Sequence, residues 1–221
     1  MNLEQARTNM VEQQIRTWEV LDQDVLDLLY VVPREDFVPP QYKALAFSDL
    51  EIPLTENATS GEKMWQPKLE ARVVQELALR KTDCVLEVGT GSGYLTALLS
   101  HRAGHVHTVE INPKLHELGR KNLSRHGVDN VTLHLGDGAR GWPRQAPYDV
   151  VVLTGSTPVL PRAFLDQLEI GGRLFAIVGE APAMTARIVT CTAPGAFHNV
   201  DLFETVVAPL KNAEQPSRFR F

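Results

Sequence analysis

The chain has 221 residues, of which 43% are hydrophobic and 22% are charged. These are ordinary globular values, and the length allows one large α/β domain or two small ones. The net charge of -5 argues against a nucleic-acid partner, because phosphate binding needs clustered lysine and arginine. No apolar run approaches the roughly 20 residues that cross a bilayer, and the amino terminus does not resemble a signal peptide. A cytoplasmic protein without a membrane partner is therefore expected.

The cysteine and histidine content predicts free thiols and no metal site. Cys84 and Cys191 each lie in an apolar stretch, so buried thiols in a reducing compartment are the preferred interpretation. His116 and Glu117 begin like the zinc-protease pattern HExxH, but Arg120 occupies the position of the second histidine. The remaining histidines are scattered along the chain.

The first 80 residues are expected to be mainly helical. Helices are predicted from Asn2 to about Ala46, with Asp22 as the N-cap of one of them. The segment Ser48–Trp65 is rich in turn-forming residues and is expected to be irregular. Pro67 suits the first position of a helix. The apolar face of that helix is formed by Leu69, Val73, Leu77 and Ala78.

From Cys84 onward, the sequence alternates between predicted strands and predicted helices. Helices are expected from Tyr94, after the capping pair Asn112-Pro113, and over Pro161–Leu168, with Gly171-Gly172 as a turn. The strands are expected at Cys84–Val88, His105–Ile111, Val131–Leu135, Asp149–Leu153, Leu174–Val178, Arg187–Cys191 and Leu202–Val207. Such alternation is typical of a doubly wound parallel sheet, in which ligands bind beyond the carboxyl ends of the strands.

A glycine-rich loop follows the first of these strands and opens a helix. It reads Glu87-Val88-Gly89-Thr90-Gly91-Ser92-Gly93, and the N–H groups at the helix start suit a phosphate or a carboxylate. A dinucleotide fingerprint G-x-G-x-x-G would place its third glycine on Tyr94 or Thr96, so that pattern fails. The observed G-x-G-x-G after Glu87 resembles the S-adenosylmethionine loop of Rossmann-like methyltransferases.

Two further features lie at the ends of the next strands. Glu110, followed by Ile111, is placed to accept hydrogen bonds from ribose hydroxyls, although a solvated carboxylate is the alternative. Asp137, between Gly136 and Gly138, is placed to bond an adenine amino group, although a plain turn is the alternative. The joint placement of the three features at successive strand ends favours a cofactor site.

Seven stretches between Met10 and Gly179 resemble the protein-L-isoaspartate O-methyltransferase family. They are MVEQQIR, VPREDFVP, VLEVGTGSGYLTALL, HTVEINPKL, DNVTLHLGDGARGWP, APYDVVVLTGSTPVLP and GGRLFAIVG. The resemblance implies a mixed seven-stranded sheet with helices on both faces and an antiparallel last strand. It also implies S-adenosylmethionine as cofactor and methylation of isoaspartyl carboxyls in damaged proteins.

The resemblance also assigns positions along a single methyltransferase domain. Residues 1–80 would form the helical, substrate-side region, residues 81–180 the cofactor-binding core, and residues 181–221 the carboxyl-terminal β segments. The residues expected at the cofactor are Glu87, Gly89, Thr90, Gly91, Gly93, Glu110, Ile111, Gly136, Asp137 and Gly138.

The sequence departs from the family pattern before the glycine loop. Family members carry G-Q-T-I-S-Q-P where this chain has Gly61-Glu62-Lys63-Met64-Trp65-Gln66-Pro67, so Lys63 and Trp65 replace two hydroxyls. The ending FETVVAPLKNAEQPSRFRF also departs from the family. Lys63 is expected to attract the substrate carboxylate, Ser60 to offer a hydroxyl, and Trp65 either to shape the cleft or to pack in the core.

Three functions remain open on the sequence. The leading one is methylation of isoaspartyl carboxyls, for which no general base is needed because the acceptor, with a pKa of roughly 3.9, is already ionised. The alternatives are a methyltransferase with another acceptor and a non-catalytic binder of the cofactor. A nicotinamide dehydrogenase is a distant fourth, because its glycine spacing fails.

Overall fold

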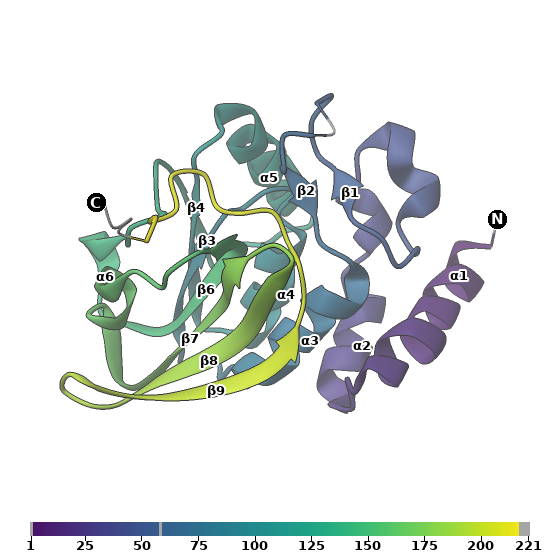
Figure 1. Cartoon of the computed structure of the whole chain (residues 1–221). Helices are drawn as coiled ribbons and strands as arrows, with labels where there is room; N and C mark the ends of the chain where they lie inside the picture. The colour runs from purple at the N-terminus through teal and green to yellow at the C-terminus, as the bar shows by residue number, and fades with distance from the viewer. Residues whose placement is uncertain (1, 58, 217–221) are drawn as a thin grey trace.

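The computed structural model describes residues 2–57 and 59–216, and its centre is a seven-stranded sheet (Figure 1). The strand order is β5-β4-β3-β6-β7-β8-β9, and the strands from β3 to β7 pair in parallel. The strands are β3 (Cys84–Val88), β4 (His105–Glu110), β5 (Val131–Leu135), β6 (Tyr148–Thr157), β7 (Leu168–Glu180), β8 (Ala183–Ala193) and β9 (Ala196–Glu204). The mixed, Rossmann-like sheet predicted from the sequence is confirmed.

The sheet reverses direction one strand earlier than the family resemblance implied. Strand β8 runs antiparallel to both β7 and β9, so the last strand, β9, points the same way as β7. The connections before and after β8 are only two residues long. Such short connections permit hairpins, whereas a parallel pairing requires a crossover of a dozen or more residues.

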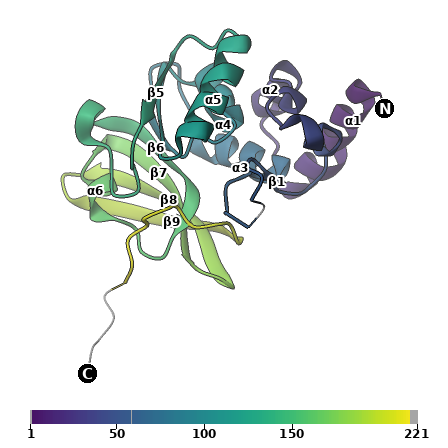
Figure 2. The same ribbon diagram turned by 90° about the horizontal axis from the view of Figure 1, so that it is seen from above.

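Helices cover the two faces of the sheet unequally (Figure 2). On one face lie α3 (Pro67–Leu77), α4 (Tyr94–Arg102) and α5 (Pro113–Arg125), where apolar side chains such as Val85, Val106 and Leu123 share one core cluster. On the other face, the four-residue α6 (Arg162–Leu165) contributes Phe164 to a second core cluster, which also contains Leu86. The thicker layer holds the helices that begin at the carboxyl ends of β3 and β4.

The amino-terminal region is helical, as predicted. It contains α1 (Leu3–Asn9), the π-helical η1 (Met10–Ile15), η2 (Arg16–Trp18), α2 (Gln23–Val31), η3 (Arg34–Asp36) and η4 (Pro40–Leu45). Asp22 caps α2 by accepting a hydrogen bond of 2.9 Å from the Asp24 N–H. The following segment is irregular apart from the short antiparallel pair β1 (Ile52–Pro53) and β2 (Lys63–Met64). No helix among the described residues is long and apolar enough to span a membrane.

The prediction for Pro161–Leu168 and the glycine pair after it was wrong in detail. The helix ends at Leu165, and β7 already begins at Leu168, so Gly171 and Gly172 lie inside a strand. Between its pairs with Tyr148 and Val150 of β6, β7 shifts register. A Cβ on Gly172 would lie 2.9 Å from the carbonyl oxygens of both Tyr148 and Glu169, so close backbone approach within this irregular part of β7 requires glycine there.

Candidate active site

The three sequence features at successive strand ends meet at one cleft, at the carboxyl edge of β3, β4 and β5. Parallel strands present their carboxyl ends at the same edge, so the loops that follow them are neighbours. The residues predicted for the cofactor that line this cleft are Gly89, Gly91, Glu110, Ile111, Gly136, Asp137 and Gly138. The opposite wall comes from the segment around Lys63 and from residues 208–211.

The glycine loop has a backbone conformation that side chains would disturb. Gly89 has a φ of +105°, and a Cβ there would lie 2.1 Å from the Thr154 hydroxyl oxygen. That hydroxyl donates to the Val88 and Gly89 carbonyls, at 2.7 and 2.8 Å. Gly93, with a φ of +82°, is the N-cap of α4 and packs against α5 rather than lining the cleft. The loop backbone is therefore open toward the cleft and fixed from behind.

Glu87 lies underneath the loop rather than in the cleft. Its side chain is fully buried, and one carboxyl oxygen accepts hydrogen bonds from Thr96 at 2.5 Å and Thr108 at 2.7 Å. The Thr90 hydroxyl continues this network to Thr108 at 2.6 Å. Burial raises the pKa of Glu87 to about 7, although the two threonine hydroxyls act in the opposite direction. Glu87 and Thr90 thus support the loop from the side of the sheet covered by α4.

Two carboxylates on the cleft wall are oriented by hydrogen bonds from nearby groups. Glu110 accepts the N–H of Gly91 and the N–H of Asn112, each at 2.9 Å. Asp137 accepts the N–H of Ala139 at 3.0 Å and, through its other oxygen, the side-chain amide of Asn212 at 2.8 Å. Because each carboxylate oxygen has two acceptor positions, both groups keep capacity for a ligand.

Lys63 faces the cleft from β2. Its ammonium group pairs with the Glu51 carboxylate at 2.9 Å, and its side chain lines both the cleft and an adjoining cavity beside the glycine loop. Trp65 is only 6% exposed and belongs to the core, although it also lines that cavity. The Ser60 hydroxyl contacts Thr55 at 3.0 Å and borders two grooves outside the cleft. Of the three residues named for the acceptor side, Lys63 alone lines the cofactor cleft.

A buried arginine that the sequence did not point to holds the segment from Gly61 to Pro67, here called the acceptor segment, in place. Arg34, from the stretch VPREDFVP, is fully buried and pairs with the buried Glu70. It also donates to the Trp65 carbonyl at 2.5 Å and to the Ala46 carbonyl at 2.9 Å. Its guanidinium lies 5.0 Å from the centre of the Tyr94 ring, and burial lowers its pKa to about 10. In the sequence, Arg34 is marked only by its place in VPREDFVP, one of the stretches that resemble the family.

The carboxyl-terminal segment was also missed. Residues 205–213, here called the strap, follow β9 (Figure 1), and residues 208–211 of this segment line the cleft. The strap is fixed to β6 because the Ser156 N–H donates to the Ala208 carbonyl at 3.0 Å and the Leu210 N–H donates to the Ser156 carbonyl at 2.9 Å. The sequence predicts a strand over Leu202–Val207 and shows that this ending departs from the family, but β9 already ends at Glu204.

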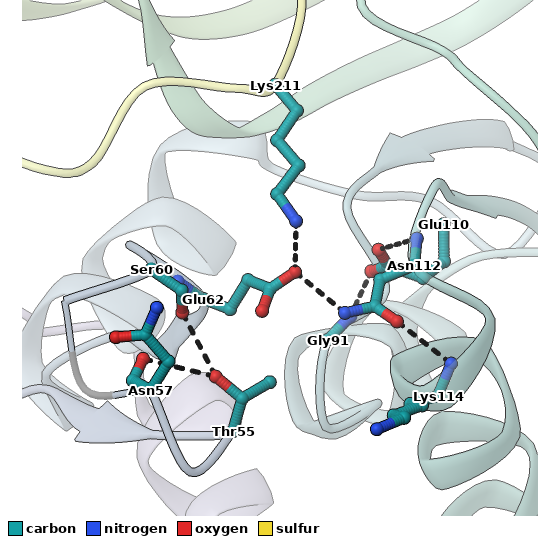
Figure 3. A network of polar contacts seen from close by, with 9 residues as sticks. All are labelled: Thr55, Asn57, Ser60, Glu62, Gly91, Glu110, Asn112, Lys114 and Lys211. Atoms are coloured by element: carbon teal, nitrogen blue, oxygen red, sulfur yellow. Dashed lines mark hydrogen bonds and ion pairs between the residues drawn. The ribbon is translucent and has the colours of Figure 1, made fainter.

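Figure 3 shows how the strap meets the acceptor segment. One carboxyl oxygen of Glu62 accepts from both the Lys211 ammonium group and the Asn112 side-chain amide, the latter at 2.7 Å. Partial burial acts to raise the pKa of Glu62, but the hydrogen bonds from Lys211 and Asn112 bring it below its usual value. Within residues 2–57 and 59–216, no group of three or more His, Cys, Asp or Glu side chains is arranged to hold a metal.

Comparison with known proteins bears on this geometry. The family described as Protein-L-isoaspartate(D-aspartate) O-methyltransferase matches residues 5–215. A protein-L-isoaspartate O-methyltransferase of Methanoculleus marisnigri is 42% identical over 173 residues, covering 78% of this chain and 77% of its own. One from Rhodopseudomonas palustris is 40% identical over 207 residues, covering 93% of each chain.

Solved structures show the same fold. A protein-L-isoaspartate O-methyltransferase aligns with a TM-score of 0.79 and 26% identity, over 92% of this chain and 65% of its own. A Plasmodium falciparum protein, solved with S-adenosyl-L-homocysteine, aligns with a TM-score of 0.77 and 18% identity over 91% and 96%. The family and the fold predicted from the sequence are both confirmed. The chain belongs to the protein-L-isoaspartate O-methyltransferase family of S-adenosylmethionine-dependent enzymes.

Proposed function

We propose that this protein methylates the free carboxyl group of L-isoaspartyl residues in damaged proteins and peptides, using S-adenosylmethionine. The observation that carries the proposal is the single cleft that joins the glycine loop, Glu110 and Asp137 to Lys63. This arrangement offers a cofactor site on one wall and a cation for an anionic acceptor on the other. A cytoplasmic location is part of the proposal and accords with the free thiols of Cys84 and Cys191.

The cofactor wall fits the chemistry of S-adenosylmethionine. Gly89 and Gly91 line this wall without a Cβ, so the cofactor can lie directly against the loop. Glu110 would accept from the ribose hydroxyls, and Asp137 from the adenine amino group. The bound cofactor supplies a methyl group on a positively charged sulfur.

The acceptor wall has to orient an anion. The isoaspartyl carboxylate is ionised at neutral pH and attacks the methyl carbon in line with the departing sulfur, giving a methyl ester and S-adenosylhomocysteine. Lys63 would attract and align the carboxylate, with Glu51 holding the ammonium group in position. The buried Trp65 would limit the depth of the pocket beside the glycine loop. No proton has to be removed from the acceptor, so the lost hydroxyls are not required as bases.

The test is transfer of labelled methyl from S-adenosylmethionine to an isoaspartyl peptide, with the matching aspartyl peptide as control. Base-labile label on the isoaspartyl peptide alone supports the proposal. S-adenosylhomocysteine binding without label on either peptide would contradict it. Since Lys63 and Trp65 stand where the family has hydroxyls, that outcome would favour another methyl acceptor or a non-catalytic binding role.

A further inference from the structure

The two places where this chain departs from the family pattern touch each other on the acceptor wall of the cleft. Glu62 belongs to the altered acceptor segment, and Lys211 belongs to the altered ending, 149 residues later. The Glu62 carboxylate is 13% exposed and the Lys211 side chain 48% exposed, so the pair lies at the mouth of the cleft. An isolated exposed ion pair contributes little to stability, but the Glu62–Lys211 pair is part of a hydrogen-bond network.

The network extends from Glu62 to the cofactor wall. Asn112, which donates to Glu62, is the N-cap of α5 and accepts the Lys114 N–H at 2.9 Å. The backbone N–H of Asn112 donates to Glu110 at 2.9 Å. A single carboxylate therefore joins the acceptor segment, the strap and the connection that follows Glu110 at the end of β4 (Figure 3). We call Glu62, Lys211 and Asn112 the clasp.

The strap is tied on its other side as well. Asn212, the residue after Lys211, donates its side-chain amide to Asp137 at 2.8 Å. Two consecutive residues of the strap thus reach opposite walls of the cleft, while the backbone before them is bonded to Ser156 of β6. A ligand held between Glu110 and Asp137 lies next to this crossing, so widening the cleft there requires these contacts to break.

We propose that Glu62 is a positioning residue that closes the cofactor cleft through Lys211, and that the clasp sets the dissociation rate of S-adenosylmethionine and S-adenosylhomocysteine. This inference rests on the proposed function for the identity of the ligand. Because the clasp depends on an ion pair at the mouth of the cleft, its effect should weaken as salt screens the two charges.

The experiment measures S-adenosylhomocysteine dissociation by stopped flow in the full chain at low and high salt. Glu62→Gln keeps an acceptor for Asn112 but loses the charge, and Lys211→Met removes the partner. At low salt each variant should release the ligand about three- to fivefold faster than the unmodified protein. The double variant should be no faster than either single one, because the two residues act as a pair.

Two controls separate the clasp from a general loss of structure. Lys211→Arg keeps the charge and should stay within about twofold of the unmodified protein. Arg162→Met breaks the exposed Arg162–Asp166 pair, neither residue of which lines the cleft, and should leave the rate unchanged. High salt should speed release from the unmodified protein and leave Glu62→Gln almost unaffected.

The outcomes distinguish this inference from the proposed function. Equal dissociation rates in all variants, additive effects, or a salt dependence that survives in Glu62→Gln would overturn the clasp. If the clasp behaves as expected but isoaspartyl peptides acquire no methyl group, only the proposed function fails. If S-adenosylhomocysteine does not bind the unmodified protein, both fail.

Discussion

The two walls of the cleft are built in different ways. The cofactor wall consists of the carboxyl ends of β3, β4 and β5 and the short segments that follow them, so the sheet itself brings Gly89, Glu110 and Asp137 together. The acceptor wall combines Leu54 and residues 61–63 with the strap and is held by side chains distant in sequence, such as Glu62 and Lys211. The strand topology can therefore keep the cofactor wall intact while the residues of the acceptor wall change. The departures of this chain from its family lie in the acceptor wall.

The largest expected effect comes from removing the support under the acceptor wall. Arg34→Met leaves Glu70 charged and buried and removes a donor from the Trp65 carbonyl. The free energy of unfolding, measured with urea, should fall by about 3–5 kcal/mol. Arg162→Met, at a pair whose side chains are 61% and 57% exposed, should change it by less than about 1 kcal/mol. A similar small loss in both variants would mean that Arg34 does not support this wall.

A substitution at Gly89 should disrupt the cofactor wall. A methyl group there meets the Thr154 hydroxyl and a φ of +105°, so Gly89→Ala should weaken S-adenosylhomocysteine binding by about a hundredfold or more in calorimetry. Gly127→Ala is the matched control, since its φ is +65° but nothing lies within 4 Å of the added carbon. An affinity for Gly89→Ala within about threefold of the unmodified protein would contradict this account of the loop.

The support of the cofactor loop should also depend on pH. The folded-state pKa of Glu87, about 7, lies above its ordinary value of 4.5, so the native state binds this proton more tightly. The stability contributed by the group is complete below pH 4.5 and is lost as the pH rises toward 7. We therefore compare the free energy of unfolding of Glu87→Gln with that of the unmodified protein. The variant's advantage in this free energy should be greater at pH 8 than at pH 5, by about 1–3 kcal/mol. Equal differences in the free energy of unfolding at both pH values would show that Glu87 is ionised in the folded state at pH 5.

The sequence predicts the two walls to different extents. Apolar runs and the glycine loop predict the parallel strands, and strand ends then place Glu110 and Asp137 together. The same pattern does not tell whether Glu87 lines the cleft, because this depends on which sheet face α4 covers. The Arg34–Glu70 pair and the strap depend on contacts between distant segments, which periodicity does not encode. Gly171 and Gly172 suggest a turn when the sequence is considered alone. The local sequence does not reveal that the backbone of β6 lies close to Gly172.

The most direct test of separate walls is Lys63→Met, assayed for both walls in one preparation. We expect kcat/KM for an isoaspartyl peptide to fall about tenfold, because the variant loses the cation for the acceptor carboxylate. The dissociation constant of S-adenosylhomocysteine should change by less than about twofold. Lys68→Met is the matched control, since Lys68 pairs with Asp49 outside the cleft and should preserve both values. Unchanged kcat/KM in Lys63→Met, or an equal loss in cofactor affinity, would contradict the account.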